Sequence, residues 1–424
     1  MKRLALVTLV LFSLLFANVG NANAGKLLLS KGDTVAICGD SITEQKLYSQ
    51  FIEAYLTACV PELELNMVQL GWGGERAEGF ALRMENDLMP WQPDVVTTCY
   101  GMNDGQYRKY DEKIGEYYRT NMLKIAERMK KGGVKTVIGS PGVVDSYTWK
   151  RDLPDFDKVY NENLGKLGQI AKEIAVEYDF AFTDVHNLMA EVMAKAKAKY
   201  GQEYPVAGFD GVHPIHNGHL VMAYAFLRAL GLDGKIGIIT IDMNGPGECS
   251  QGHKVITTQA GEIQVLSSRY PFCLQGKVDD PRATTGIVEF FGFNQDLNRL
   301  MLVVKNLKTK EADVVWAQNR KRFTRKQLED GINLSAEFVD NPFSRPFANL
   351  LQRIAEKQKY ETTMIKNTLS NFRNFENLAK KDAELKAAFE TVRKKLTEKH
   401  SELSKNVRDA VVPVQYLIKV EPVK

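Results

Sequence analysis

The sequence predicts a three-layer α/β/α fold built on a parallel sheet, followed by a small β-rich unit and a C-terminal helical segment. In the first half, short apolar runs alternate with stretches of helical periodicity, a pattern typical of strands joined by crossover helices. From residue 235 onward, short alternating runs are separated by Gly, Pro and Asn, which favours β-structure. Near the C-terminus, apolar residues recur every three or four positions, which indicates helices.

Each expected strand of the sheet is a short run of apolar or β-branched residues. The runs occupy residues 34–38, 63–70, 94–99, 135–140 and 181–185. Helical patterns lie between or after them, at 47–58, 117–131, 157–178 and 214–230. Because helices separate consecutive strands, the strands are expected to run parallel, with helices on both faces of the sheet.

The second half is expected to hold further strands at 236–243, 253–258, 262–266, 287–291 and 300–304. Residues 351–408 are expected to be helical, because apolar side chains keep the spacing of a helix face at Leu385, Phe389, Val392, Leu396 and Leu403. Residues 414–420 alternate and are expected to return as a last strand to the β-rich unit. The predicted division is a leader at 1–24, an α/β domain at 25–233, a β-rich region at 234–350 and a helical region at 351–424.

The N-terminus has the features of a secretory signal peptide. Lys2-Arg3 precedes the apolar run 4–16, and Ala22-Asn23-Ala24 offers small residues for cleavage before Gly25. The apolar run is too short to span a bilayer, and no later segment reaches that length. We therefore expect an exported, periplasmic or extracellular protein, cleaved near Ala24.

Composition and charge narrow the function classes. The chain has 424 residues, 44% of them apolar and 25% charged, which is typical of a soluble protein with more than one folded unit. A net charge of +4 does not indicate a nucleic-acid-binding protein. Residues 351–409 carry more basic than acidic side chains, which fits either a solvated helical hairpin packed on the α/β domain or contact with an acidic polysaccharide or envelope surface.

The five cysteines suggest neither a disulfide framework nor a zinc site. Cys38, Cys59 and Cys99 fall in apolar patterns and are expected to be buried. Cys249 and Cys273 lie in a loop-rich stretch, and the sequence leaves open whether they form a disulfide. No Cys-x-x-Cys pair occurs, and neither a metal nor a cofactor is expected.

Chemistry is first indicated by Gly39-Asp40-Ser41, between an apolar run and a helical stretch. The serine hydroxyl is thereby expected on a sharp strand-to-helix turn at the positive end of a helix, a place that suits an acyl-transfer nucleophile. Such tripeptides are also ordinary turns, so further motifs are needed.

Three further motifs follow in order. Gly71-Trp72-Gly73-Gly74-Glu75 ends the second expected strand, and its glycines allow close approach of backbone to a ligand and positive φ angles. Gly101-Met102-Asn103-Asp104 ends the third, where an amide can donate to an oxyanion. The last motif is Asp210-Gly211-Val212-His213-Pro214. Its histidine is suited to act as a general base, and its carboxylate lies three residues earlier.

Together these motifs resemble the SGNH (GDSL-type) hydrolase family over residues 26–232, about half of the chain. The resemblance implies a flavodoxin-like sheet, with Ser41 as nucleophile, His213 as base and Asp210 as the orienting acid. It also implies an oxyanion hole made of the Ser41 and Gly74 backbone N–H groups and the Asn103 side chain. No cofactor is implied.

Some residues depart from the commonest family pattern or suggest other roles. Glu75-Arg76 stands where small polar residues are frequent, and His216 adds an imidazole, which together bear on substrate fit. Three histidines, His213, His216 and His219, recur at a spacing that could suggest a metal, but the family pattern accounts for two of them without one. Asp104 and Asp145 are interpreted as loop carboxylates without an apparent partner. Aromatic residues that could stack on a sugar or pack in the core are Trp72, Tyr107, Tyr110 and Trp149.

Three functions remain open at this stage. Export, the accessory units and the aromatic residues favour a serine esterase that removes acetyl groups from carbohydrates, an analogy with exported family members. A lipid esterase, lysophospholipase or thioesterase is the second hypothesis, although no run of apolar residues follows the strands to form an acyl groove. A non-catalytic glycan-binding protein is the third, and the intact Ser41, Asp210 and His213 argue against it.

Overall fold

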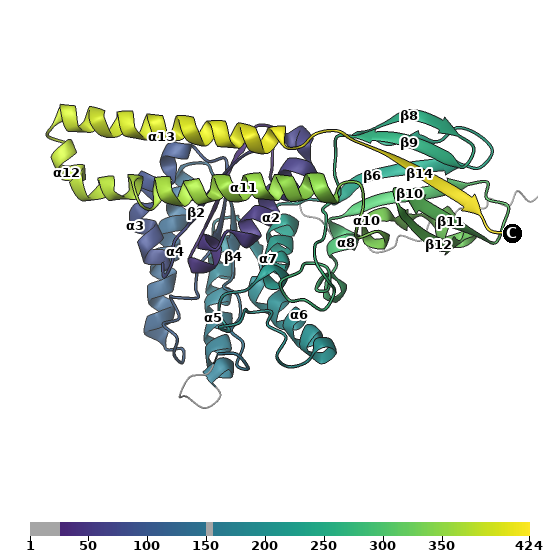
Figure 1. Cartoon of the computed structure of the whole chain (residues 1–424). Coiled ribbons are helices and arrows are strands. Elements are labelled where there is room, and N and C mark those ends of the chain that lie inside the picture. The colour runs from purple at the N-terminus through teal and green to yellow at the C-terminus, as the bar shows by residue number, and fades with distance from the viewer. Residues whose placement is uncertain (1–25, 150–155) are drawn as a thin grey trace, which may run out of the picture.

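The computed structural model describes residues 26–149 and 156–424. The predicted signal peptide lies outside the described residues. Figure 1 shows an α/β domain, a β-rich unit beside it, and a long helical hairpin that lies along the domain and leads into the last strand. None of the described helices is both long and apolar enough to cross a bilayer.

The central sheet has five parallel strands in the order β2-β1-β3-β4-β5, which is the flavodoxin-like order. Its strands are β1 (Thr34–Gly39), β2 (Asn66–Gly71), β3 (Val95–Cys99), β4 (Lys135–Gly139) and β5 (Ala181–Thr183). The predicted parallel sheet is confirmed, with each strand within a few residues of its expected position. All five residues of β3 are buried, as expected for a strand covered on both faces.

Helices cover both faces of the sheet, which confirms the three-layer prediction. One apolar cluster joins alternate residues of β1, such as Val35 and Ile37, to α2 (Leu47–Ala58), α6 (Val185–Tyr200) and α7 (His216–Ala229). The intervening residues Ala36 and Cys38 belong to a second cluster, with α3 (Ala77–Asp87), α4 (Glu112–Lys131) and α5 (Phe156–Glu177). The two-residue period of the strand thus divides its side chains between two cores.

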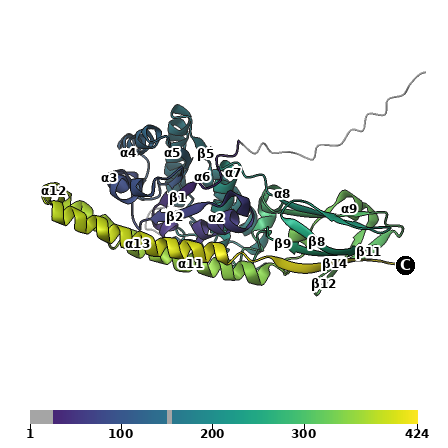
Figure 2. The same cartoon turned by 90° about the horizontal axis from the view of Figure 1, so that it is seen from above.

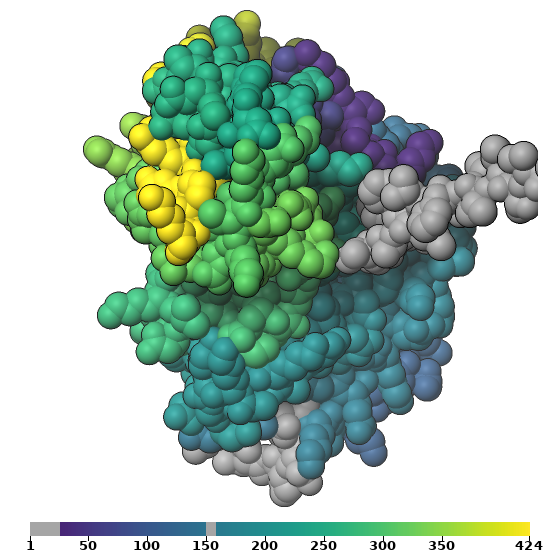
Figure 3. All heavy atoms as spheres, turned by 90° about the vertical axis from the view of Figure 1, so that its right-hand side faces the viewer, coloured from purple at the N-terminus to yellow at the C-terminus, as the bar shows by residue number. Residues whose placement is uncertain are grey.

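The β-rich unit consists of two sheets. The smaller has the order β13-β10-β6-β7 and the larger β12-β11-β14-β9-β8. Figure 3 views the molecule from the end of this unit, with the last strand in yellow. Strand bounds in the smaller sheet are β6 Lys235–Asp242, β7 Glu248–Cys249, β10 Arg299–Lys305 and β13 Ile332–Asn333; in the larger they are β8 His253–Gln259, β9 Glu262–Ser267, β11 Glu311–Trp316, β12 Asn319–Thr324 and β14 Val414–Pro422.

The prediction of one strand in this unit is wrong. Residues 287–291 contain a short 3₁₀ helix, Val288–Phe290, in place of the strand. Phe290 contacts Tyr200 of α6 edge-on and Phe291 contacts Tyr224 of α7, so the apolar run anchors a loop on the α/β domain. A short apolar run does not by itself distinguish these two uses.

The C-terminal helical prediction is confirmed as a hairpin of α11 (Ser344–Ile365) and α13 (Ala383–Asp409). The hairpin runs along one side of the α/β domain in both views (Figures 1 and 2). Between its arms lie a 3₁₀ segment, η4 (Leu369–Phe375), and α12 (Glu376–Ala379). The last strand, β14, pairs antiparallel with β9 and β11, as expected from its alternation. The remaining short helices are α1 Ser41–Glu44, α8 Phe293–Asp296, α9 Arg325–Asp330 and α10 Leu334–Glu337.

Helix α11 is integral to the α/β domain rather than an appendage. Lys357 is buried and lies 2.9 Å from the Glu53 carboxylate of α2 and 2.7 Å from Glu361 of its own helix. The second Glu361 oxygen accepts the backbone N–H of Gln69 at 3.0 Å, on the edge strand β2. The helix therefore covers the strand edge that would otherwise offer unpaired backbone groups to another chain.

A fragment spanning residues 25–233 is expected to aggregate. Its loss of α11 uncovers the β2 edge and exposes the apolar side chains against which Ile354 and Met364 of α11 pack. Size-exclusion chromatography and thermal denaturation test this prediction. A monomeric fragment with a cooperative melting transition would contradict it.

Candidate active site

Ser41 lies at the turn where β1 passes into α1, at the carboxyl edge of the sheet. Asp40 caps this helix, its buried side chain accepting the Ile42 N–H at 3.0 Å. The turn requires Gly39, because a Cβ there would lie 2.1 Å from Thr43 Oγ1 and 2.9 Å from the Cys99 carbonyl oxygen. The glycine thus allows β1, α1 and β3 to approach closely enough to fix the Ser41 position.

The helix after Ser41 is shorter than the sequence suggested. α1 has only four residues, and Lys46 then adopts a left-handed conformation with φ of 66° before α2 begins. A single turn supplies little helix dipole, because the dipole grows from many aligned peptide units. Activation of Ser41 therefore depends on its hydrogen-bond partner.

That partner is His213, in the loop before α7. His213 Nε2 lies 2.8 Å from Ser41 Oγ, and His213 Nδ1 lies 2.7 Å from Asp210 Oδ2. The other Asp210 oxygen accepts the backbone N–H groups of Val212 and His213 at 2.9 and 2.8 Å. With Nδ1–H donating to Asp210, Nε2 is free to accept the Ser41 proton. The structure thus brings together the serine, histidine and carboxylate that the sequence singled out.

The charges of this group favour a basic imidazole. The Asp210 hydrogen bond raises the pKa of His213 above its usual value, although partial burial opposes this shift. Burial also opposes ionisation of Asp210, but its hydrogen bonds from the His213 side chain and from the His213 and Val212 backbone lower its pKa to about 2. Asp210 is therefore ionised throughout the pH range in which His213 titrates.

Activity is expected to fall on acidification, with an apparent pKa above 6.5 in kcat/KM. A general base must be neutral, and the Asp210 interaction raises the pKa of His213, so protonation removes the active form at a higher pH than for a free imidazole. A pH profile of p-nitrophenyl acetate hydrolysis, corrected for spontaneous hydrolysis, checks this. An acid limb centred well below pH 6 would contradict the assignment.

The loop that carries His213 is held by Asp145, a residue for which the sequence suggested no partner. That interpretation is wrong: the buried Asp145 carboxylate lies 2.8 Å from Lys197 Nζ of α6. The Asp145 N–H donates to the Gly211 carbonyl at 2.9 Å. At Gly211, φ is 76° and a Cβ would lie 2.5 Å from Trp149 Cβ, so the loop packs tightly here.

The predicted oxyanion donors follow the ends of three neighbouring strands. Gly39 pairs in register with Gly71 of β2 and with Cys99 of β3, and Ser41, Gly74 and Asn103 follow these three positions. Gly74 is exposed with φ of 73°. Among the described residues, the Ser41 and Gly74 N–H groups donate to no other protein group.

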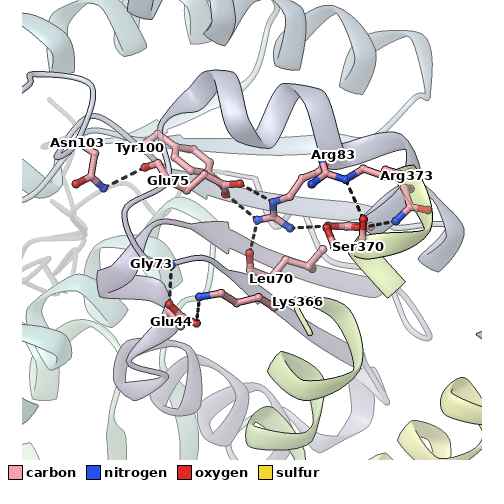
Figure 4. Close-up of polar contacts among 12 residues, drawn as sticks. Glu44, Leu70, Gly73, Glu75, Arg83, Tyr100, Asn103, Lys366, Ser370 and Arg373 are labelled. Atoms are coloured by element: carbon pink, nitrogen blue, oxygen red, sulfur yellow. Dashed lines mark hydrogen bonds and ion pairs between the residues drawn. The ribbon is translucent and has the colours of Figure 1, made fainter. Parts of the chain in front are cut away.

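Asn103 is fixed at both ends of its amide. Its Nδ2 donates to the Glu75 carbonyl at 3.0 Å, and its Oδ1 accepts from the Tyr107 hydroxyl at 3.1 Å. Figure 4 shows the amide turned toward the Glu75 backbone. One amide hydrogen is used in this contact, so the second is the one that Asn103 can offer to an oxyanion.

Glu75 has a structural role that the sequence did not reveal. Its buried carboxylate accepts from Arg83 at 2.7 and 2.8 Å and from the Tyr100 hydroxyl at 2.9 Å, and Arg83 also contacts Asp87 (Figure 4). The carboxylate therefore faces the interior and not a substrate. Arg83 and Asp87 stand four residues apart on α3, but no local pattern pairs them with Glu75.

Asp104 also has a partner, contrary to expectation. Its buried Oδ1 accepts the Ala77 N–H at the start of α3, at 3.0 Å. Burial raises the pKa of Asp104 to about 7. The residue thus ties the loop after β3 to the first turn of α3, beside the segment 71–75 at the end of β2, which is called the glycine loop below.

The remaining candidates have structural roles. His219 is fully buried, accepting the Tyr48 N–H with Nδ1 and contacting Gln45 with Nε2. His216 is partly buried, and this burial lowers its pKa below the usual value for a histidine. No cluster of three or more metal-ligating side chains occurs among the described residues. Cys249 and Cys273 are both free thiols, so the disulfide that the sequence left open is not formed.

The aromatic residues divide between packing and the site rim. Tyr107 contacts Trp149 edge-on, with ring centroids 5.4 Å apart, next to the His213 loop. Trp72 is partly exposed, with the Arg83 guanidinium and the Lys366 ammonium each about 5 Å from its ring. The Tyr110 ring contacts a different cation, the Lys166 ammonium.

Comparison with known proteins agrees with this geometry. Residues 37–221 match the model of the GDSL-like lipase/acylhydrolase family. An acetylxylan esterase of Geobacillus stearothermophilus is 26% identical over 219 residues, which are 50% of this chain and 96% of that protein. A solved structure described as a gut microbial diltiazem-metabolizing enzyme has 21% identity and a TM-score of 0.72, and the alignment covers 93% of this chain and 98% of that one.

The last comparison extends the shared fold beyond the α/β domain to nearly the whole chain, including the β-rich unit and the helical hairpin. The family match covers the segment that contains Ser41, Gly74, Asn103, Asp210 and His213. Over residues 37–221 the protein is therefore similar to the GDSL-like (SGNH) lipase/acylhydrolase family, and it is a hydrolase of ester bonds that resembles carbohydrate acetylesterases.

Proposed function

We propose that the protein removes acetyl groups from carbohydrate esters through a covalent acyl intermediate on Ser41. The observation that carries the proposal is the hydrogen-bonded series Ser41, His213 and Asp210, with distances of 2.8 and 2.7 Å. Such a series makes a weakly acidic hydroxyl nucleophilic, because a base receives the proton as the new bond forms.

In the first half of the reaction, Ser41 Oγ attacks the ester carbonyl while its proton passes to His213 Nε2. The negative oxygen of the tetrahedral intermediate is stabilised by the Ser41 and Gly74 N–H groups and the free Asn103 amide hydrogen. The ionised Asp210 stabilises the imidazolium. His213 then donates its proton to the leaving sugar oxygen, and the carbon–oxygen bond breaks.

In the second half, His213 removes a proton from water, which attacks the acetyl ester of Ser41. The same donors stabilise the second tetrahedral intermediate, and His213 returns the proton to Ser41 Oγ as acetate leaves. All proton transfers pass through one nitrogen, Nε2, that stays next to Ser41 Oγ. The ester therefore yields one alcohol and one carboxylic acid, with water consumed.

The choice of an acetylated sugar rests on two further observations. The 26%-identical relative is an acetylxylan esterase and spans the half of this chain that holds the site. Trp72, Tyr107 and Trp149 are partly exposed on loops near the proposed oxyanion donors and the His213 loop, where aromatic faces can pack against sugar rings.

Acetate release from acetylated xylo-oligosaccharides, measured beside hydrolysis of p-nitrophenyl acetate and octanoate, tests the substrate class. We expect turnover of the acetylated sugar and a clear preference for acetate over octanoate, with no activity in Ser41→Ala. A preference for octanoate without release of sugar-bound acetate would instead identify a lipid esterase or thioesterase.

Export is a separate part of the proposal. It is supported by the basic pair Lys2-Arg3, the apolar run behind it and the small residues Ala22-Asn23-Ala24. N-terminal sequencing of protein recovered from a periplasmic or culture fraction is expected to begin near Gly25. Recovery of the uncleaved chain from the cytoplasm would contradict it.

A further inference from the structure

The end of helix α11 reaches the glycine loop through Glu44. Lys366 Nζ lies 2.6 Å from Glu44 Oε1, and Glu44 Oε2 accepts the Gly73 N–H at 2.5 Å (Figure 4). A Cβ on Gly73 would lie 2.6 Å from the same carboxylate oxygen, so any other residue here would displace this carboxylate. The Lys366 ammonium thereby fixes a carboxylate that holds the residue directly before Gly74.

A second series starts in η4 and ends at Asn103. The buried Ser370 hydroxyl donates to Asp87 Oδ2 at 2.9 Å, and Arg83 contacts the same oxygen at 3.3 Å. Arg83 also binds both oxygens of Glu75, whose carbonyl accepts the Asn103 amide. Since Arg83 and Asp87 are almost completely buried, water does not replace these contacts.

A third series links α11 to the helix that carries Ser41. Glu361 accepts the Gln69 N–H at 3.0 Å, and Gln69 Nε2 donates to the Thr43 carbonyl of α1 at 2.7 Å. All three series start within residues 361–370, which comprise the end of α11, its C-cap residue Lys366 and the beginning of η4. They end on α1, on the glycine loop and at Asn103.

We propose that the α11–η4 segment positions the oxyanion-binding loop, and that Lys366 and Ser370 are positioning residues that act through Glu44 and Asp87. Neither side chain reaches the reacting atoms. The loop needs such support because Gly74 is exposed and has a positive φ, so its own conformational preference is weak. Donors aimed at a developing charge are effective only when they are held in place before the reaction.

If Lys366 had a purely structural role, its loss would change the stability of the protein and not its catalytic rate. The side chain is 26% exposed and that of Glu44 23%, and ion pairs this accessible to water contribute little to stability. Loss of the ammonium should therefore leave the folded state nearly intact. A positioning role instead lowers the rate, because a displaced donor stabilises the transition state less than before.

The test compares variants of Lys366, Ser370 and Tyr360 with the wild type, all as the full-length protein. Lys366→Met removes the charge and keeps the length of the side chain, and Lys366→Arg keeps the charge. Tyr360→Phe is the matched control, because its hydroxyl donates to the Leu396 carbonyl within the hairpin and contacts neither α1 nor the glycine loop. For each, kcat and KM are measured with p-nitrophenyl acetate, together with the melting temperature and the affinity for a boronic acid, whose adduct on serine places an oxygen among the oxyanion donors.

We expect Lys366→Met to lower kcat roughly tenfold, a fraction of the ~10²–10³-fold effect of removing one oxyanion donor outright. KM should stay within about twofold, and boronic acid binding should weaken by a factor similar to the loss in kcat. Lys366→Arg should recover most of the rate, and Tyr360→Phe should resemble the wild type. Ser370→Ala should show the same kinetic pattern through the second series.

The inference rests on the proposed function, and the two fail differently. If the wild type does not hydrolyse p-nitrophenyl acetate, or if Ser41→Ala remains active, the proposed function is wrong whatever Lys366 does. If the wild type is active and folded Lys366→Met keeps its kcat and boronic acid affinity, the positioning role is wrong. Should Lys366→Met fail to fold, an unchanged kcat in folded Ser370→Ala would overturn the inference equally.

Discussion

Ser41→Ala is expected to lower kcat for acetyl esters by roughly 10⁴-fold or more, because it removes the atom that forms the acyl intermediate. The protein should fold normally, since the hydroxyl is partly exposed and its side-chain hydrogen bond goes to His213. Initial rates with p-nitrophenyl acetate and a melting curve give the two quantities needed.

Ser49→Ala serves as a control for general effects of losing a hydroxyl. Ser49 is buried on α2 and donates to Gln358 of α11, away from the reacting atoms. It should affect the melting temperature more than the rate, the reverse of Ser41→Ala. Near-wild-type turnover by folded Ser41→Ala would remove Ser41 from the mechanism.

Asp210→Asn is expected to reduce turnover by as much as ~10⁴-fold, by analogy with other serine triads. An amide can favour the wrong tautomer of His213 and cannot stabilise its cation. The hydrogen bond and charge of Asp210 raise the pKa of His213, so the variant should also shift the acid limb of the residual activity to lower pH. The pH profile thus separates this role from simple damage to the fold.

The size of the loss in Asp210→Asn depends on how far the backbone of the His213 loop orients the imidazole without the Asp210 charge. Asp210 also accepts two backbone N–H groups in its own loop, and an asparagine side-chain oxygen can keep these contacts. The loop should therefore remain ordered in the variant. A loss below tenfold, with an unshifted acid limb, would mean that backbone geometry alone orients His213.

Those parts of the fold that depend on local patterns could be predicted from the sequence. Strands β1 to β5 are short apolar runs between helical segments, and their order and direction follow from that alternation and the family resemblance. The site residues could be named because each follows a strand end or precedes a helix, and parallel strands bring these positions to one edge. The alternation of residues 414–420 was sufficient to predict β14.

Contacts between distant segments could not be predicted. Lys366 and Glu44 are 322 positions apart, and Ser370 and Asp87 are 283 apart, so neither period nor turn chemistry pairs them. Asp145 was interpreted as an unpartnered carboxylate for the same reason, since Lys197 of α6 is 52 positions away. Glu75 is only eight positions from Arg83, but the pair joins a loop to a helix, where no fixed period predicts the contact, so Glu75 was interpreted as bearing on substrate fit.

Labelling with a fluorophosphonate tests the central claim most directly, because this reagent reacts with a serine only where a base and oxyanion donors activate it. The account predicts one adduct per chain, located by mass spectrometry on the peptide that contains Ser41, in proportion to the loss of esterase activity. His213→Ala should label far more slowly. Full activity at saturating reagent, or an adduct on another residue that accounts for the inactivation, would contradict the mechanism.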